Sequence, residues 1–173
     1  AFPTDSTQHL DRDEDGYGDD SEGYQADNCP DSYGDSYQDR FGCLDSDGDG
    51  WSDDGDMLPL EITQYEDQDG DGYGDSSQGN YPDSCVDVYG LSNIQRYGCP
   101  DSDGDGWDDE LDAFPDDSQF WSDSDGDSYP DQTGTKLSDD CPDVAGDSSE
   151  DRIGCLDSDG DGWSDEADSF PED

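Results

Sequence analysis

Residues 45–56 read DSDGDGWSDDGD, and this stretch decides how the chain folds. Aspartates stand at its positions 1, 3, 5, 9 and 12, and a glycine stands at position 6. Alternate carboxylates of a tight loop turn inward together, and glycine permits the sharp turn that follows them. Calcium prefers about six to eight oxygen ligands, which such a loop supplies with the help of the position-7 carbonyl. The stretch therefore predicts a loop wrapped around a calcium ion.

The same acidic pattern recurs six times in the 173 residues, in two alternating kinds of loop. Trp loops carry tryptophan at position 7, and each fills every ligand position of the pattern. Their predicted ligands are Asp45, Asp47, Asp49, Trp51, Asp53, Asp56, Asp101, Asp103, Asp105, Trp107, Asp109, Asp112, Asp157, Asp159, Asp161, Trp163, Asp165 and Asp168. The tryptophans contribute their backbone carbonyls to this set.

Tyr loops carry tyrosine at position 7 and have no regular acid at position 12. An in-phase aspartate follows five residues later, and we infer an enlarged loop that ends with this closing aspartate. The predicted ligands are Asp11, Asp13, Asp15, Tyr17, Asp19, Asp27, Asp67, Asp69, Asp71, Tyr73, Asp75, Asp83, Asp123, Asp125, Asp127, Tyr129, Asp131 and Asp139. In the third Tyr loop Ser128 replaces the glycine of position 6, which predicts a distorted or weaker site.

Each kind of loop repeats at one constant interval, without insertion or deletion, as the step from Asp45 to Asp101 and on to Asp157 shows. We therefore expect three repeat units at residues 11–66, 67–122 and 123–173, after residues 1–10 in the phase of a preceding unit. The chain begins and ends at one point of the repeat, because residues 1–5 and 169–173 are in phase. This fits either a window of a longer array or a subunit that continues head to tail into a second copy.

Composition excludes a conventional core and several partners. Leu, Ile, Val and Phe number 19, whereas acidic residues number 53 and the formal charge is −48. So little apolar area cannot offset the backbone ordering cost of about 1–2 kcal/mol per residue. Nucleic acid is excluded as a direct partner by its like charge, and no apolar run is long enough for a membrane span. Crowded carboxylates repel each other without metal, so an acidic linker explains the six loops poorly.

Calcium is favoured over other ions. Magnesium needs a small octahedral site, and softer metals need histidine or thiolate ligands that the loops lack. One to two ions in each loop predict about 6–12 calcium ions in all.

The six cysteines are in phase and permit 15 pairings. Local pairing within each repeat is favoured, because each unit must be self-sufficient to repeat; it predicts Cys29–Cys43, Cys85–Cys99 and Cys141–Cys155. Zinc is disfavoured by the absence of close Cys-x-x-Cys pairs, and disulfides indicate a secreted, extracellular protein.

Three in-phase arginines, Arg40, Arg96 and Arg152, precede the second cysteine of each pair by three residues. We expect structural roles in which each guanidinium binds carboxylates or carbonyls between adjacent loops. Anion binding is the alternative. The position-7 aromatics are expected to form small clusters between units, with carbohydrate stacking as the alternative for the tryptophans.

The pattern D-x-D-x-D-G-x-x-D at residues 11–19, followed by D-N-C-P at residues 27–30, resembles the thrombospondin type 3 repeat. The block DSDGDGWSDE at residues 157–166 is similar to tandem repeats of large archaeal and bacterial surface proteins, especially marine ones. The resemblance implies calcium held by stacked loops, local disulfides, few regular elements, and a secreted or cell-surface role. The enlarged Tyr loops depart from that pattern, and D-N-C-P is kept only in the first unit.

The expected fold is thus a linear calcium- and disulfide-stapled array with little regular secondary structure, strands of two to four residues, and one helical turn after a Trp loop near residues 108–113. The expected function is structural: a spacer or head-to-tail filament element whose fold depends on calcium. The alternatives are an adhesin or stalk that presents aromatics to glycan or protein, and an acidic protein associated with mineral. No catalytic constellation is present in the sequence, so an enzyme is not expected.

Overall fold

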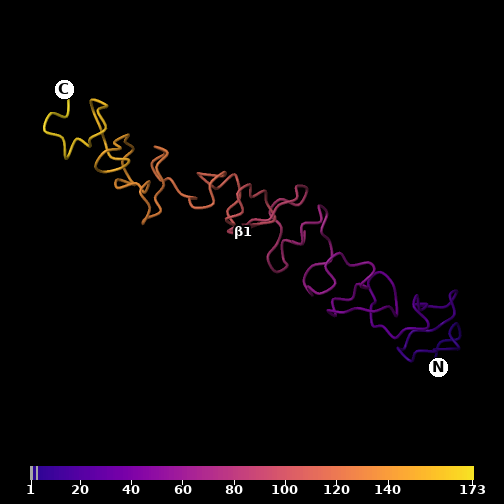
Figure 1. Ribbon diagram of the computed structural model, residues 1–173. Coiled ribbons are helices and arrows are strands. Elements are labelled where there is room, and N and C mark those ends of the chain that lie inside the picture. The colour runs from indigo at the N-terminus through magenta and orange to yellow at the C-terminus, as the bar shows by residue number, and fades with distance from the viewer. Residues whose placement is uncertain (1, 3) are drawn as a thin grey trace. The chain divides into compact units, whose positions relative to one another are not determined.

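The computed structural model describes residue 2 and residues 4–173; residues 1 and 3, which belong to the predicted segment 1–10, lie outside this part of the chain. The described residues contain no helix and only two strands, β1 (Asn93–Ile94) and β2 (Arg96–Tyr97) (Figure 1). The strands pair antiparallel, with Asn93 opposite Tyr97 and Ile94 opposite Arg96. The predicted fold class, an irregular array of disulfide-stapled repeats, is confirmed. No helix of the described part is long and apolar enough to cross a membrane.

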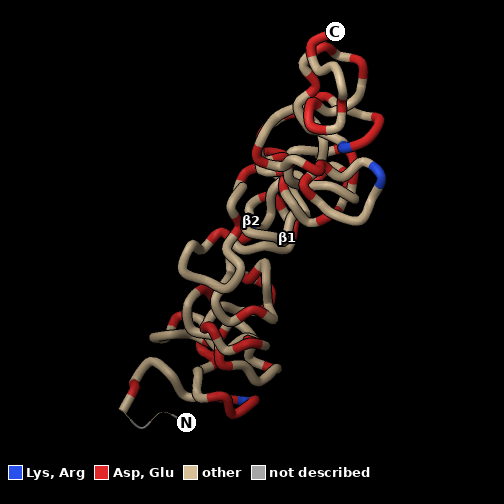
Figure 2. The backbone as a smooth tube through the Cα atoms, turned by 90° about the vertical axis from the view of Figure 1, so that its left-hand side faces the viewer, with Lys and Arg blue, Asp and Glu red and all other residues tan. Residues whose placement is uncertain are grey.

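The chain forms two compact units, Ala1–Gly90 and Leu91–Asp173. Acidic residues occur throughout the loops of each unit, and basic residues are rare in both (Figure 2). The boundary lies inside the predicted second repeat, so the compact units do not follow the period of the sequence.

The helical turn expected near residues 108–113 is present only as a hydrogen-bonded turn. The Asp112 N–H donates to the Asp108 carbonyl at 2.9 Å, and the Leu111 N–H donates to the same carbonyl at 3.0 Å. The expected single helical turn is therefore present as an isolated turn, and no helix continues from it. The next residues turn away because the Phe114 N–H donates to the Asp112 side chain at 2.7 Å, and Pro115 follows without an N–H.

The interior of the described chain is polar. Its buried apolar residues are three cysteines and Phe120, whereas fully buried serines, a glutamine and an aspartate take the place of an aliphatic core. Buried polar groups of this kind must be hydrogen-bonded or must bind an ion, because an unpaired buried group costs about 1–3 kcal/mol. Hydrogen bonds or bound ions, and not apolar packing, therefore hold the loops in their geometry.

A disulfide segment separates the Tyr loop from the Trp loop of each repeat. Cys29 is joined to Cys43 and Cys141 to Cys155, and the remaining two cysteines, Cys85 and Cys99, are disulfide-bonded as well. The predicted local pairing is confirmed. Each bridge closes a segment of similar size, which in the chain-entropy view stabilises it by about 3 kcal/mol.

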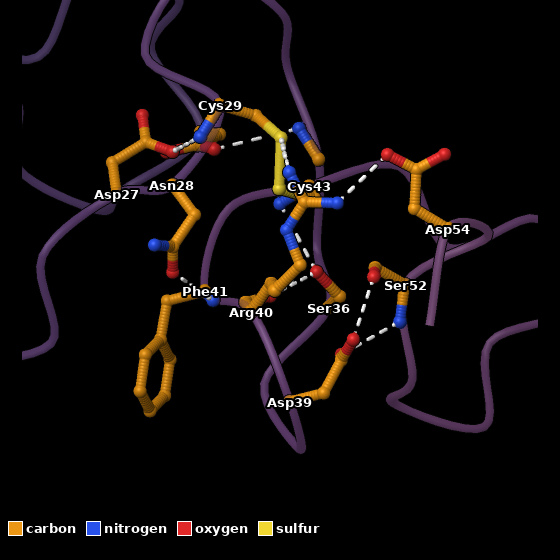
Figure 3. The surroundings of a disulfide bond; sticks show 12 residues. Asp27, Asn28, Cys29, Ser36, Asp39, Arg40, Phe41, Cys43, Ser52 and Asp54 are labelled. Carbon is orange, nitrogen blue, oxygen red and sulfur yellow. Dashed lines mark hydrogen bonds and ion pairs between the residues drawn. A yellow bond between two sulfur atoms is a disulfide. The ribbon is translucent and has the colours of Figure 1, made fainter. Parts of the chain in front are cut away.

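A buried serine hydroxyl joins backbone groups of each disulfide segment, and Figure 3 shows the first of them, Ser36. The hydroxyl of Ser36 donates to the Arg40 carbonyl and accepts the Cys43 N–H at 3.0 Å. Ser92 and Ser148 make the same two bonds in the other repeats. Sequence analysis did not select these serines, although they repeat in phase with the cysteines.

The arginines of the disulfide segments bind acids of the following Trp loop. Arg40 donates to Asp54 at 2.7 Å and lies 3.8 Å from the Cys29 sulfur (Figure 3). Arg96 donates to Glu110 at 2.6 Å, and Arg152 pairs with Glu166. The three acidic partners share one phase of the repeat, so the contact recurs with the sequence. The arginines thus link the disulfide segment to the loop that follows it.

Candidate metal centres

The first three aspartates of a loop converge in both kinds of loop. Their carboxylate oxygens lie within 4.8 Å of one another in at least five of the six loops: Asp11, Asp13 and Asp15; Asp45, Asp47 and Asp49; Asp67, Asp69 and Asp71; Asp101, Asp103 and Asp105; Asp123, Asp125 and Asp127. The structure therefore brings together the residues that the alternation of the sequence placed on one face.

Backbone N–H groups hold these carboxylates in place, as the Trp loop at residues 45–56 illustrates. Asp45 accepts the N–H groups of Gly48 at 2.7 Å and Gly50 at 2.9 Å. Asp49 accepts the Trp51 N–H at 2.8 Å, and Asp47 accepts the Asp49 N–H at 3.1 Å. Gly50 lies at φ 102°, a conformation that side chains disfavour, so the glycine of position 6 is required by this turn.

One oxygen of the position-3 aspartate points inward without a partner. The Oδ2 atoms concerned are buried and accept no hydrogen bond from the described residues; they belong to Asp13, Asp47, Asp69, Asp103 and Asp125. A buried carboxylate oxygen without a donor is costly unless a cation lies against it. The same oxygen in five loops therefore marks the interior of each loop as a place for a positive ion.

The last aspartate of a Trp loop completes the cluster. Asp56 is only 8% exposed, and its Oδ1 accepts the Leu58 N–H at 2.6 Å. Burial raises the pKa of Asp56, and the nearby carboxylates of the first three aspartates raise it further. Asp112 has the same burial and the same causes of a raised pKa.

The closing aspartate of a Tyr loop corresponds to the last aspartate of a Trp loop, although it lies farther along the chain from the first three aspartates. Asp27, Asp83 and Asp139 are more than nine-tenths buried, and the Oδ2 atom of each has no partner among the described residues. Burial raises the pKa of Asp83 to about 6, and the carboxylates of Asp71, Asp69 and Asp75 add to this effect. The structure therefore places the closing aspartate against the loop acids, as the enlarged-loop hypothesis requires.

Tyr loops also contact the disulfide segment directly. The Oδ1 atom of Asp27 accepts the Cys29 N–H at 2.7 Å, and the Oδ2 atom of Asp15 lies 3.4 Å from the Gly34 nitrogen. Asp127 accepts the Gly146 N–H at 2.9 Å in the third repeat. A Cβ atom on Gly42 would lie 2.4 Å from Asp27 Oδ1, so this backbone approaches the cluster more closely than a side chain allows.

Position 9 makes a different contact in the Trp loops. Asp53 accepts the N–H and the hydroxyl of Ser46, each at 2.7 Å, on its two oxygens. Asp109 and Asp165 bind Ser102 and Ser158 in the same way. Each carboxylate oxygen keeps a second lone pair, so direct or water-mediated ligation by position 9 stays a prediction.

The third Tyr loop retains the local geometry despite its serine. Ser128 lies at φ 78°, and its N–H donates to Asp123 at 2.9 Å. Gly72 makes the equivalent bond to Asp67 at 2.9 Å. The serine adopts a backbone conformation that favours glycine. The substitution therefore strains the backbone but keeps the hydrogen-bond pattern.

Two glutamines that sequence analysis missed hold the enlarged part of the first two Tyr loops. The buried amide of Gln8 accepts the Asp20 N–H at 3.0 Å and donates to the carbonyls of Asp20 and Tyr24 at 3.1 and 3.3 Å. Gln64, which is 1% exposed, makes equivalent bonds to Ser76 and Asn80. The two glutamines occupy the same position of successive repeats, and this is the sequence signal that would have identified them.

The third repeat replaces this amide with an apolar side chain. Phe120 stands in phase with the two glutamines, is buried, and lies 5.9 Å from Phe114 between ring centroids. Gly18 and Gly23, whose Cβ atoms would overlap Gln8, are replaced in phase by Pro130 and Thr135. The three positions have changed together, as expected for residues that pack against each other.

The tryptophans of position 7 stack on aromatic rings that stand shortly before the next Tyr loop. Trp51 lies 4.5 Å from Tyr65 with planes 8° apart, and Trp107 lies 6.4 Å from Trp121 with planes 10° apart. Tyr17 lies 5.6 Å from Phe41. The aromatics thus form small clusters, but each of these pairs lies within one predicted repeat unit and not between two units, so the expected location of the clusters is wrong.

The arrangement suits a hard cation bound by oxygen. Each of the clusters named above offers converging carboxylates with buried, unpartnered oxygens, and none of these clusters contains a histidine or cysteine. No protein-family model matches the chain, and a search of curated proteins finds no match.

Proposed function

We propose that this chain is an extracellular calcium-binding repeat protein, whose loops form a rigid spacer only when calcium occupies them. The supporting observation is the buried, unpartnered carboxylate oxygen that recurs at position 3 of the loops and in the closing aspartates. The loops contain only oxygen donors, which favours calcium over softer metals. If each of the six loops holds one to two ions, the chain binds about 6–12 calcium ions.

An extracellular location is supported by the disulfides, which persist in oxidising environments. Resemblance to thrombospondin type 3 repeats supports the same proposal. Stability from calcium rises with its free concentration, and extracellular calcium is abundant enough to fill weak sites.

A structural role is favoured over glycan binding by the aromatic stacks. Rings of the same chain cover one face of the indoles of Trp51 and Trp107 and fix their orientation, so these side chains already have a structural use.

We also propose that the array extends head to tail into a filament. Trp163 is 47% exposed, and an aromatic ring of another repeat would stack on it as Tyr65 stacks on Trp51.

The experiment that tests the calcium proposal combines calorimetry with small-angle scattering, with the disulfides kept oxidised. Calcium should bind to the calcium-free chain in about 6–12 sites and reduce its radius of gyration, whereas magnesium should do neither at the same concentration. Unchanged dimensions after chelation would contradict the proposal.

A matched pair of variants assigns the sites. Asp47→Asn removes the charge of one loop ligand, whereas Asp54→Asn removes an exposed acid that pairs with Arg40 outside the cluster. We expect Asp47→Asn to weaken one site by about tenfold or more, and Asp54→Asn to leave every site unchanged. Equal effects of the two variants would show that general charge, and not loop geometry, holds calcium.

A further inference from the structure

One turn of this acidic chain exposes a group of aliphatic side chains. Residues 57–62 read MLPLEI, and we call them the aliphatic turn. Met57, Leu60 and Ile62 are 57, 84 and 57% exposed. Met57 and Leu60 line a shallow pocket together with Leu58, Pro59 and Glu61, so the apolar atoms form one continuous patch.

The backbone of this turn does not require aliphatic side chains. The Met57 N–H donates to the Tyr65 carbonyl at 3.1 Å, and the Glu61 N–H donates to the Leu58 carbonyl at 2.9 Å. The equivalent turn of the second repeat makes the same two bonds, at 3.3 and 2.8 Å, from Ala113 and Asp117.

The residue choice differs sharply between these equivalent turns. Met57, Leu60 and Ile62 correspond to Ala113, Asp116 and Ser118. The same backbone therefore folds with small or polar side chains. Exposed aliphatic groups contribute little to the stability of their own chain, and a continuous exposed apolar patch marks an interaction surface.

The charge around the patch selects the kind of partner. Residues 41–95 contain no lysine or arginine, and four of their acids, Asp54, Glu61, Glu66 and Asp87, lie outside the predicted calcium ligands. Glu61 borders the pocket, and its carboxylate accepts hydrogen bonds from Thr63 and Asn80 at 2.8 and 2.9 Å. Hydrogen bonds to the charged form lower the pKa of Glu61, so it is ionised at neutral pH.

We propose that the aliphatic turn docks a segment of a partner protein that carries aliphatic or aromatic side chains beside lysine or arginine. The apolar side chains of the partner would cover Met57 and Leu60, and its basic groups would face the surrounding carboxylates. This inference adds a binding partner to the proposed spacer and uses no metal ligand.

Two other occupants fit less well. A second copy would bring another acidic surface to the patch, and three side chains fall well short of the roughly 800 Å² per partner of a stable dimer. A membrane surface with anionic lipids would be repelled by the same acidic surroundings.

The test uses a phage-displayed library of random peptides, selected on the full chain in calcium and near-physiological salt. Selected peptides should combine apolar with basic residues. Their affinity should fall by about tenfold or more for the triple variant M57A/L60D/I62S, which carries the residues of the equivalent turn. The converse variant A113M/D116L/S118I should gain a second binding site.

Calcium stoichiometry and scattering of both variants show whether the array is intact. If the first variant fails to fold, L60D alone and the gain-of-site variant carry the test. Unaltered calcium binding in these variants separates failure of the docking proposal from failure of the calcium proposal.

Several outcomes would overturn the proposal. Peptides that bind the wild type and the triple variant equally would show a purely electrostatic attraction, and a library without enriched peptides would exclude docking. Concentration-dependent dimers that the triple variant abolishes would identify a second copy as the occupant. Binding to phosphatidylcholine or phosphatidylglycerol vesicles that depends on Leu60 would identify a lipid surface.

Discussion

The Trp loops and Tyr loops gather the same acids but complete their clusters differently. A Trp loop ends with an aspartate only a few residues beyond position 9, as Asp56 does, so its predicted ligands lie in one short stretch of chain. A Tyr loop ends with Asp27, which lies two residues before a disulfide-bonded cysteine and binds its N–H. The ligand set of a Tyr loop therefore reaches the disulfide segment, and in the first two repeats a buried glutamine also holds the loop. A Trp loop contacts its disulfide segment through groups outside the predicted ligand set, such as Ser52 and Asp54.

Removal of one disulfide should separate the two kinds of loop most strongly. The double variant Cys29→Ser/Cys43→Ser frees the segment that holds Asp27 and Asp15, and we expect about 3 kcal/mol less stability for the first Tyr loop. Terbium luminescence measures this loss. Excitation of tryptophan reports on the three Trp loops and on the third Tyr loop, which Trp121 precedes, whereas the first Tyr loop contains tyrosine and no tryptophan and responds to excitation of tyrosine.

The Trp loop at residues 101–112 serves as the internal control for this variant, and its terbium affinity should stay unchanged. Equal weakening of tryptophan-sensitised and tyrosine-sensitised binding would show that both kinds of loop depend on the disulfide.

Loss of a buried glutamine should weaken a Tyr loop next most strongly. Gln64→Ala leaves the N–H and carbonyl of Ser76 and the carbonyl of Asn80 without their partner, at a cost of about 1–3 kcal/mol. Calcium titration should show weaker binding at the second Tyr loop. The exposed Gln78→Ala is the matched control, and a comparable loss in that variant would contradict the role of burial.

Acid should release calcium from a Tyr loop in a defined range. The pKa of Asp83 is raised to about 6 in the metal-free fold, so protons compete with calcium and affinity should fall as pH drops through about 6. In the metal-free chain the sign is opposite. Protonated Asp83 stabilises the fold fully below its unfolded pKa of about 4, and this contribution is lost as pH rises through about 6.

Calorimetry in calcium at several pH values, and scattering of the chelated chain over the same range, measure the two effects. Asp83→Asn is the control, because its second Tyr loop should bind calcium weakly at all of these pH values. Calcium affinity that stays constant as pH crosses about 6 would contradict the assignment of that pKa to this carboxyl group.

The smallest effect is expected at Ser128. Ser128→Gly relieves a positive φ of 78° and should stabilise the third Tyr loop by about 1 kcal/mol, which calcium affinity at that loop reports. Ser124→Gly and Ser138→Gly are unsuitable as neutral controls because these hydroxyls bind Asp131 and Thr135, so Ser149→Gly, an exposed serine outside the acidic cluster, is preferable. Unchanged affinity after Ser128→Gly would show that this turn carries no strain.

The sequence was sufficient to predict the loops, because alternation and phase place Asp45, Asp47 and Asp49 together without any long-range contact. It was also sufficient for the local disulfide pairing and for the scarcity of regular structure. The closing aspartates could be predicted only from the repeat, since Asp27 stands well beyond the loop that begins at Asp11.

The polar supports of the loops could not be predicted in the same way. The amide of Gln64 acts through backbone groups of Ser76 and Asn80, which are distant in sequence, and glutamine has no propensity that signals such a role. Ser36 likewise acts through its burial inside the disulfide segment. The second repeat places Asp108 where the first has Ser52, and pairs it with Arg96 at 2.8 Å, an exchange that requires the structure to explain.

The polar interior has a thermal consequence. Exposure of apolar surface gives unfolding its positive heat capacity change, whereas exposure of polar surface lowers that change. With Phe120 and three cysteines as its buried apolar residues, the described chain gains little heat capacity on unfolding. Its stability curve should therefore be flat, with cold denaturation far from ordinary temperatures, and each tenfold change in free calcium should shift stability by about 1.4 kcal/mol per occupied site.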